Sequence, residues 1–110
     1  MTDLPILIQP SLDEHGHLED SNEWNETLAN WFAEREHIQL TAAHWEVIYF
    51  FRQFYAEYHA IPATRLLVQA IAKQLGKEKG NSIYLQQLFP VSLPRQASRI
   101  AGLPKPARCM

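Results

Sequence analysis

The sequence predicts a mainly α protein: a small orthogonal bundle of about five helices, with a short N-terminal β-hairpin and a flexible C-terminal arm. Apolar residues recur at helical spacing through most of the chain. Capping residues, glycines and prolines divide these stretches into separate helices. A length of 110 residues with an apolar fraction of 46% is enough for a single core. We therefore expect one helical domain with its hairpin over residues 1–102 and a mobile arm over residues 103–110.

The N-terminal segment favours a hairpin. Residues 4–8 are apolar and partly β-branched, and residues 13–16, Asp-Glu-His-Gly, are typical of a turn. The chain can then return through His17 and Leu18. The His15-Gly16-His17 sequence resembles a metal-binding pair only superficially, because no third ligand lies nearby in the sequence, and we interpret it as part of the turn.

Five helices are expected after this turn. The first begins at a Ser21 or Asn22 cap and ends at about His37. The second covers residues 42–59 and is apolar around much of its circumference, which is typical of the central, most buried helix. We expect the aromatic side chains of both helices to pack in the core. The other three helices are predicted at residues 64–75, closed by Gly76, at residues 82–88, stopped by Pro90, and from Pro94 to Ala101, with Gly102 after its end.

The segment after Gly102 is the predicted arm, and Gly102 is its expected hinge. Pro104 and Pro106 are excluded from a helix interior and favour extended, polyproline-like backbone, so they stiffen this segment. At about 3.1 Å per residue, the chain from Leu103 to Cys109 spans roughly 20 Å.

Cys109 is the only cysteine of the chain, so an internal disulfide is impossible and a reducing compartment suits the protein. Free cysteines are usually buried, but Cys109 lies next to the C-terminus and beyond two prolines. This position predicts an exposed, reactive thiol; an incidental terminal cysteine is the alternative. Lys105 and Arg108 favour its thiolate and the terminal carboxylate opposes it, each by about 1 kcal/mol in water. Because these effects nearly cancel, activation is expected to come from a partner's pocket.

Charge is distributed unevenly along the chain, although the net charge is only −2. Residues 1–36 contain nine acidic residues and one basic residue, whereas residues 91–110 contain four basic residues and no acidic one. A cationic C-terminal end favours an anionic partner surface, although a solvated basic tail has the same composition. No run of about 18 apolar residues and no signal-peptide pattern occurs, so we expect a cytoplasmic protein without a membrane partner. The residues expected to dock the arm on a partner are Arg95, Arg99, Lys105 and Arg108.

An ordered set of motifs from about residue 12 to the C-terminus resembles the DsrC/TusE family of sulfur-trafficking proteins, and looks most like the TusE branch. The most specific motif is the Ile-Ala-Gly-Leu-Pro-Lys-Pro sequence at residues 100–106, followed by the penultimate Cys109. The other matching segments are residues 44–48, 52–55, 62–67, 79–85, 88–90 and 96–97.

This resemblance implies a small helical protein whose penultimate cysteine, Cys109, carries sulfur. DsrC proteins that serve sulfite reduction have a second cysteine eleven positions earlier, where this chain has Ser98, which cannot close an intramolecular disulfide. The single-cysteine relay is therefore favoured. By resemblance, Cys109 accepts a persulfide sulfur from a TusBCD-like donor complex. It then delivers that sulfur to a tRNA 2-thiouridylase, with or without bound tRNA, for thiolation of the wobble uridine. No metal or organic cofactor is implied.

Two other classes of function remain open. The predicted third and fourth helices could form a helix-turn-helix, with Lys73, Lys77 and Lys79 near its turn. However, residues 82–89 contain no Arg or Lys, so phosphate neutralisation is weak and no stable DNA binding is expected. The second alternative is a DsrC-like partner or regulatory subunit of a sulfite-reductase-type complex, which acts only by docking its arm. This alternative predicts that Cys109→Ser still supports activity.

Overall fold

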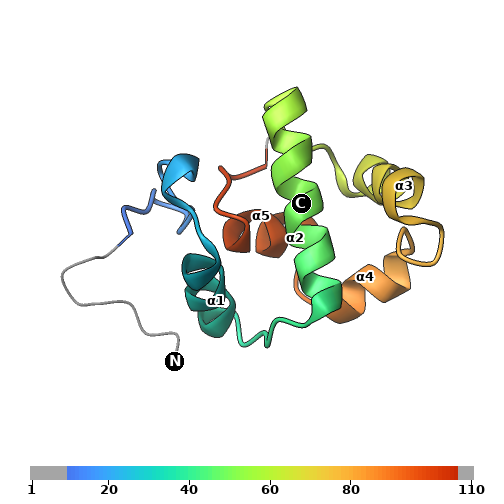
Figure 1. Ribbon diagram of the computed structural model, residues 1–110, viewed down its shortest axis with the longest axis horizontal. Coiled ribbons are helices and arrows are strands. Elements are labelled where there is room, and N and C mark those ends of the chain that lie inside the picture. Colours follow the sequence, from blue (N-terminus) through green and yellow to red (C-terminus); the bar gives the residue numbers. More distant parts are fainter. Residues whose placement is uncertain (1–9, 107–110) are drawn as a thin grey trace.

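A computed structural model describes residues 10–106; residues 1–9 and 107–110 lie outside the described part. Five α-helices account for most of the described chain, which confirms the predicted mainly α class (Figure 1). A 3₁₀ turn at Ser21–Glu23 precedes them. The helices are α1 (Glu26–Arg35), α2 (Ala42–Tyr58), α3 (Thr64–Leu75), α4 (Ser82–Leu88) and α5 (Leu93–Ile100).

The short helix α5 lies at the centre of the bundle and packs against each of the other four helices. In Figure 1 it crosses behind α2, with α1 on one side and α3 and α4 on the other. The expectation that residues 42–59 form the most buried helix is therefore wrong, because α2 exposes Tyr49 and Tyr58. The sequence did not indicate that α5 is buried, because this helix contains several polar side chains. One of them, Gln96, is almost fully buried and accepts hydrogen bonds from the backbone N–H groups of Val91 and Ser92.

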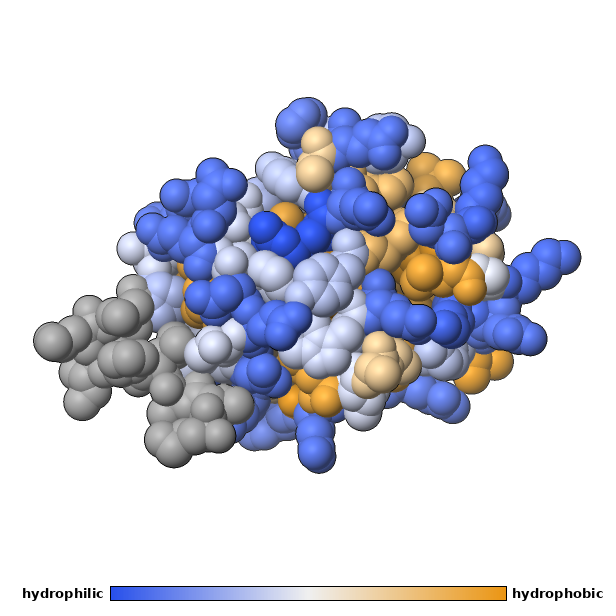
Figure 2. Space-filling view, viewed as in Figure 1, coloured by the Kyte–Doolittle hydropathy of each residue, from blue (hydrophilic) through white to orange (hydrophobic). Residues whose placement is uncertain are grey.

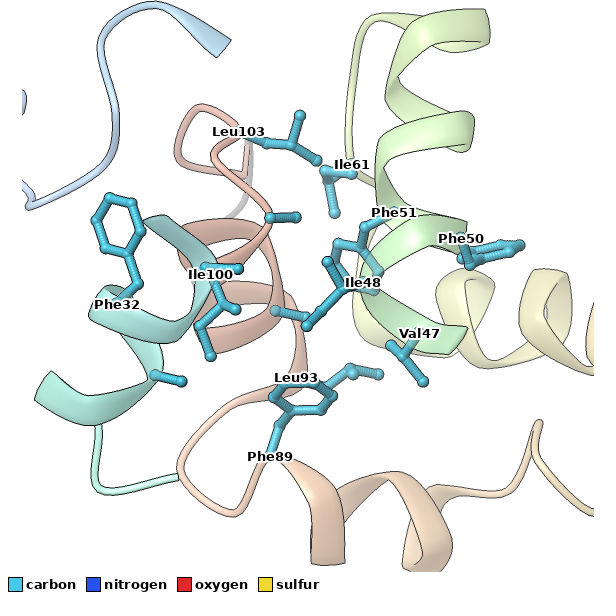
Figure 3. Close-up of a cluster of buried hydrophobic side chains, with 14 of the residues drawn as sticks. Phe32, Val47, Ile48, Phe50, Phe51, Ile61, Phe89, Leu93, Ile100 and Leu103 are labelled. Carbon is cyan, nitrogen blue, oxygen red and sulfur yellow. The ribbon is translucent and has the colours of Figure 1, made fainter. Parts of the chain in front are cut away.

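The core joins α2 to α5 and to the residues that follow α5. Ile48 and Phe51 of α2 lie against Ile100, and Leu103 points toward Ile61 of the α2–α3 connection (Figure 3). Each of these side chains is almost completely buried, which contributes about 1.5–3 kcal/mol per residue. Leu103, the first residue of the predicted arm, is thus part of the core.

Helix α1 begins later than predicted. The cap is Asn25, whose side-chain oxygen accepts the backbone N–H of Leu28 at 2.9 Å. Residues 21–23 form the separate 3₁₀ turn, and Trp24 and Asn25 have extended backbone between the turn and the helix. This extended pair redirects the chain, and it places the Trp24 ring against the end of α5.

The described residues contain no β-hairpin, only one isolated antiparallel bridge between Leu12 and Leu18; residues 4–8, which were predicted to form its first strand, lie outside the described part. The carboxylate of Asp13 accepts the backbone N–H groups of both His15 and His17. These bonds close the turn, and the chain does not continue as a strand beyond Glu19, because Asp20 caps the 3₁₀ turn at Ser21–Glu23. The segment folds as a tight loop whose left-handed residue is Gly16.

The surface seen in Figure 2 is mostly hydrophilic, with apolar side chains gathered on the side of α3 and α4. Leu66, Ile83 and Val91 are the most exposed large aliphatic residues of the described chain. Between residues 10 and 106, no helix has both the length and the apolar character needed to cross a bilayer.

His44 caps the start of α2 in its neutral form. Its Nδ1 accepts the backbone N–H of Thr41 at 3.1 Å, and its Nε2 lies 2.9 Å from the carbonyl of Leu88. A single tautomer satisfies both contacts, with the proton on Nε2. Burial lowers the pKa of His44 below its ordinary value of 6.5, because a charged imidazolium would lose its hydration there.

Acid is expected to destabilise the fold through this histidine. Because the pKa of His44 in the folded protein lies below 6.5, the unfolded chain takes up the proton first as the pH falls. The contribution of His44 to the free energy of unfolding is therefore fully present above pH 6.5 and decreases below it. The slope is at most about 1.4 kcal/mol per pH unit for one histidine. His17, whose pKa burial also lowers, acts in the same direction. Urea unfolding at pH 7.5 and pH 5.5 measures the loss.

His44→Gln separates the two contributions. A glutamine at this position still accepts the Thr41 N–H, as in an ordinary capping box, but it does not titrate. The variant should therefore lose less stability between pH 7.5 and pH 5.5 than the wild type. An identical loss in the two proteins would show that His44 is not responsible.

Candidate functional site at the root of the C-terminal arm

The end of α5 is closed by a Schellman motif, which fixes the backbone where the predicted arm begins. The N–H of Gly102 donates to the carbonyl of Arg99 at 3.1 Å, and the N–H of Leu103 donates to the carbonyl of Ser98 at 2.9 Å. Gly102 has φ = 72°, the left-handed conformation that this motif requires. We call residues 100–103 the arm root.

Two side chains from outside α5 donate hydrogen bonds to the last carbonyls of the helix. Trp24 donates its Nε1–H to the carbonyl of Ile100 at 2.8 Å. Arg52 of α2 donates to the carbonyl of Ala101 at 2.7 Å, and its guanidinium carbon lies 4.3 Å from the centroid of the Trp24 ring. Helix C-termini leave carbonyls without intrahelical partners, and these two residues supply the missing donors.

A third donor lies beyond the helix. The ring Nδ1 of His17, a residue that is 1% exposed, is 2.9 Å from the carbonyl of Leu103. A carbonyl only accepts, so Nδ1 carries the proton in this contact. Burial lowers the pKa of His17, which keeps the ring neutral at physiological pH. We refer to His17, Trp24 and Arg52 as the root donors.

The loop that carries His17 contacts the arm a second time. Lys105 is exposed, and its Nζ lies 3.2 Å from Nε2 of His15. Pro104 is exposed and Pro106 is buried. The described part of the predicted arm therefore follows the surface of the body rather than leaving it at Gly102.

The predicted docking residues have different environments. Arg99 forms an ion pair with Glu36 and donates to the carbonyl of His15, so its charge is used inside the body. Arg95 and Lys105 are exposed. Arg108 and Cys109 lie outside the described residues. The structure brings Arg99 and Lys105 close to the same loop, and it places Arg95 at the start of α5.

Position 98 carries no sulfur chemistry. Ser98 is fully buried in α5, and its hydroxyl donates to the carbonyl of Arg95 at 3.2 Å. Because Cys109 is the only cysteine, no second thiol of this chain can resolve a disulfide or persulfide formed on it. Within residues 10–106, no three His, Cys, Asp or Glu side chains are arranged to hold a metal ion.

None of the three root donors is identified by a sequence pattern. His17 has the context of a turn residue, Trp24 that of a core aromatic, and Arg52 lies in one of the motifs that match the family. A basic residue in the middle of the apolar stretch at residues 42–59 is the one sequence signal that indicates a buried acceptor. Nothing in the local sequence identifies that acceptor, because the bonded residues are 49 to 86 positions apart.

Solved structures share this fold. The chain aligns with the NMR structure of DsrC from Allochromatium vinosum at a TM-score of 0.84 and 47% identity, covering 94% of this chain and 92% of the other. The oxidized γ-subunit of the dissimilatory sulfite reductase (DsrC) from Archaeoglobus fulgidus aligns at a TM-score of 0.76 and 37% identity, covering 92% of each chain.

Sequence comparison agrees with these alignments. A sulfurtransferase TusE homolog of Haemophilus influenzae is 54% identical over 103 residues, which is 94% of each chain. Sulfurtransferase TusE of Photorhabdus laumondii is 52% identical over 98 residues, covering 89% of this chain and 88% of the relative. The family model described as DsrC like protein matches residues 8–110. This chain therefore belongs to the DsrC-like family, as a homologue of proteins named sulfurtransferase TusE.

Proposed function

We propose that this chain is a sulfur-relay protein, which accepts a persulfide sulfur on Cys109 and delivers it to a tRNA 2-thiouridylase for thiolation of the wobble uridine. The observation that carries the proposal is the match to sulfurtransferase relatives over nearly the whole chain, together with a single, penultimate cysteine. A relay needs a thiol that carries the sulfur, and Cys109 is the only cysteine of the chain.

The chemistry is thiol exchange at a sulfane sulfur. The Cys109 thiolate attacks the outer sulfur of a donor cysteine persulfide, a new S–S bond forms on Cys109, and the donor thiolate leaves. In the second step an acceptor thiolate attacks the outer sulfur on Cys109, and the Cys109 thiolate leaves. The sulfane sulfur keeps its oxidation level in both steps, so no oxidant or reductant is consumed.

The proposed partners are a TusBCD-like donor complex and the thiouridylase, both in the cytoplasm. Docking would use the cationic residues near the arm. Lys105 and Arg95 are exposed in the structure, and Arg108 is proposed to act with them. The guanidinium of Arg99 is paired with Glu36 inside the body. Removing the charge of Lys105 should weaken docking with little effect on the free energy of unfolding. Removing the charge of Arg99 should lower the free energy of unfolding, because the ion pair with Glu36 is lost.

Mass spectrometry tests the proposal. The chain is incubated with a cysteine desulfurase, cysteine and the relay donor proteins, and the C-terminal peptide is then analysed without reduction. A gain of one sulfur mass on the peptide that contains Cys109 supports a relay. A peptide that stays unmodified while the donor proteins are demonstrably loaded with persulfide contradicts it.

A further inference from the structure

The arm root is fixed by donors that come from three separate parts of the fold. They are the N-terminal loop (His17), the segment before α1 (Trp24) and helix α2 (Arg52). Each donates to a backbone carbonyl of the root, at distances between 2.7 and 2.9 Å. Because these donors bind backbone carbonyls, they fix the backbone of residues 100–103 independently of the side chains that the root carries.

His17 does more than complete the helix end. The Schellman motif already pairs the N–H groups of Gly102 and Leu103, and the carbonyl of Leu103 lies outside α5. This carbonyl is buried, so it needs a donor from the protein, and the His17 ring supplies one from a loop 86 positions away. The hydrogen bond extends the fixed path of the backbone past the end of the helix.

Lys105 continues the same path. Its contact with His15 places it on the loop that also carries His17, so this loop meets the arm at two positions. Asp13 in turn holds the loop by accepting the backbone N–H groups of His15 and His17. The path of the chain is thus fixed as far as Lys105, which precedes Cys109 in the sequence.

We propose that His17, Trp24 and Arg52 are positioning residues for sulfur transfer, which fix the position and direction of the backbone at residues 100–103, from which the chain continues to Cys109. This inference rests on the proposed function. Counted from the root alone, six residues, 104–109, lead from Leu103 to the thiol of Cys109, and the contact of Lys105 with His15 shortens the free part further. With the root released at Ile100, the link has nine residues. Effective concentration falls as the −3/2 power of linker length, so release lowers it roughly twofold, in addition to the loss of direction.

The experiment compares His17→Phe with His17→Asn. Phenylalanine keeps an aromatic ring but removes the donor, whereas the asparagine amide can place an N–H close to the position of Nδ1. Ile71→Val, in the core of α3, removes one buried methyl group but none of the root donors, so it is the control for a modest loss of stability. Arg52→Met and Arg52→Lys form a second pair, which decides the question if His17→Phe does not fold.

Two quantities are measured on each folded variant. The first is the NMR order parameter of the Lys105 amide, which needs no sulfur chemistry. The second is the steady-state rate of sulfur transfer from a persulfide-loaded donor protein. The rate at which Cys109 reacts with a small aromatic disulfide serves as the measure of intrinsic thiol reactivity. His17→Phe should lower the order parameter of the Lys105 amide and raise the KM for the donor protein at least twofold. Its kcat and its reaction with the small disulfide should not change. His17→Asn and Ile71→Val should resemble the wild type in all of these measurements.

An unchanged Lys105 order parameter or an unchanged KM in both donor-deleting variants, His17→Phe and Arg52→Met, overturns the positioning role. Equal KM changes in Ile71→Val would also overturn it, since they would show an effect of stability alone. A wild-type chain that takes no sulfur from a loaded donor would instead overturn the proposed function. In that case the order parameters would still decide whether the donors fix the root.

Discussion

Cys109→Ser is expected to abolish the gain of sulfur entirely while leaving the fold intact. A serine hydroxyl is not ionised near neutral pH and cannot hold a sulfane sulfur in an exchangeable S–S bond. Because the substitution lies beyond the packed root, the free energy of unfolding should change by no more than about 0.5 kcal/mol. Intact-mass analysis after incubation with loaded donor proteins, together with urea unfolding, checks both parts.

Lys105→Gln is the matched control on the same arm. It keeps the thiol and removes one positive charge, so it should still gain one sulfur mass at saturating donor. Binding of the donor complex should persist in Cys109→Ser, because the cationic residues remain. Should Cys109→Ser still support thiolation of tRNA, the chain would act by docking alone, as a regulatory subunit does, and the relay would be wrong.

Gly102→Ala is expected to give a large loss of stability, about 3 kcal/mol, from two causes. The first is the left-handed backbone at φ = 72°, which disfavours any Cβ. The second is steric: a Cβ at Gly102 would lie 2.4 Å from Cδ1 of Trp24. The ring must move, and it then loses its hydrogen bond to Ile100 and its contact with Arg52. For a chain whose total stability is about 5–15 kcal/mol, chemical denaturation measures this easily.

Gly16→Ala separates the two causes. Gly16 also has a positive φ, of 82°, but the nearest atom to a methyl group added there would be Nε of Arg99, at the ordinary contact distance of 3.7 Å. This control should therefore cost only the backbone contribution, about 1 kcal/mol. Equal losses in the two variants would mean that the Trp24 ring does not press on Gly102, and that the root is less tightly packed than the structure indicates.

The starts of the helices were predicted well where they depend on capping residues next to them in the sequence. The helices predicted at residues 42–59 and 82–88 begin directly after Thr41 and Asn81, two residue types that favour the N-cap, and Pro94 lies in the first turn of α5. The start of α1 was predicted too early because Ser21, Asn22 and Asn25 are all good caps, and it is the side chain of Asn25 that caps the helix. The central place of α5 was missed because the burial of a polar side chain depends on partners from other segments, as with Gln96 and the N–H groups of Val91 and Ser92.

The candidate site divides in the same way. Cys109 could be proposed from the sequence because persulfide chemistry requires a cysteine and the chain has only one; this assignment stays a prediction. The root donors could not, since a hydrogen bond from His17 to Leu103 joins residues 86 positions apart and uses a carbonyl that every residue possesses. Gly102 was predicted as a hinge from its residue type, and that role stays a prediction. Its packing against Trp24 is a tertiary contact that no local sequence pattern indicates.

The central claim is that Cys109 carries sulfur from a donor to an acceptor, and a single-turnover chase tests it most directly. The chain is loaded with isotopically labelled sulfur, freed of donor proteins, and mixed with the thiouridylase, ATP and tRNA. A relay predicts that label disappears from Cys109 as it appears in the thiolated uridine, at matching rates and yields. Label that stays on Cys109, or that is lost as free sulfide while tRNA remains unlabelled, would contradict it.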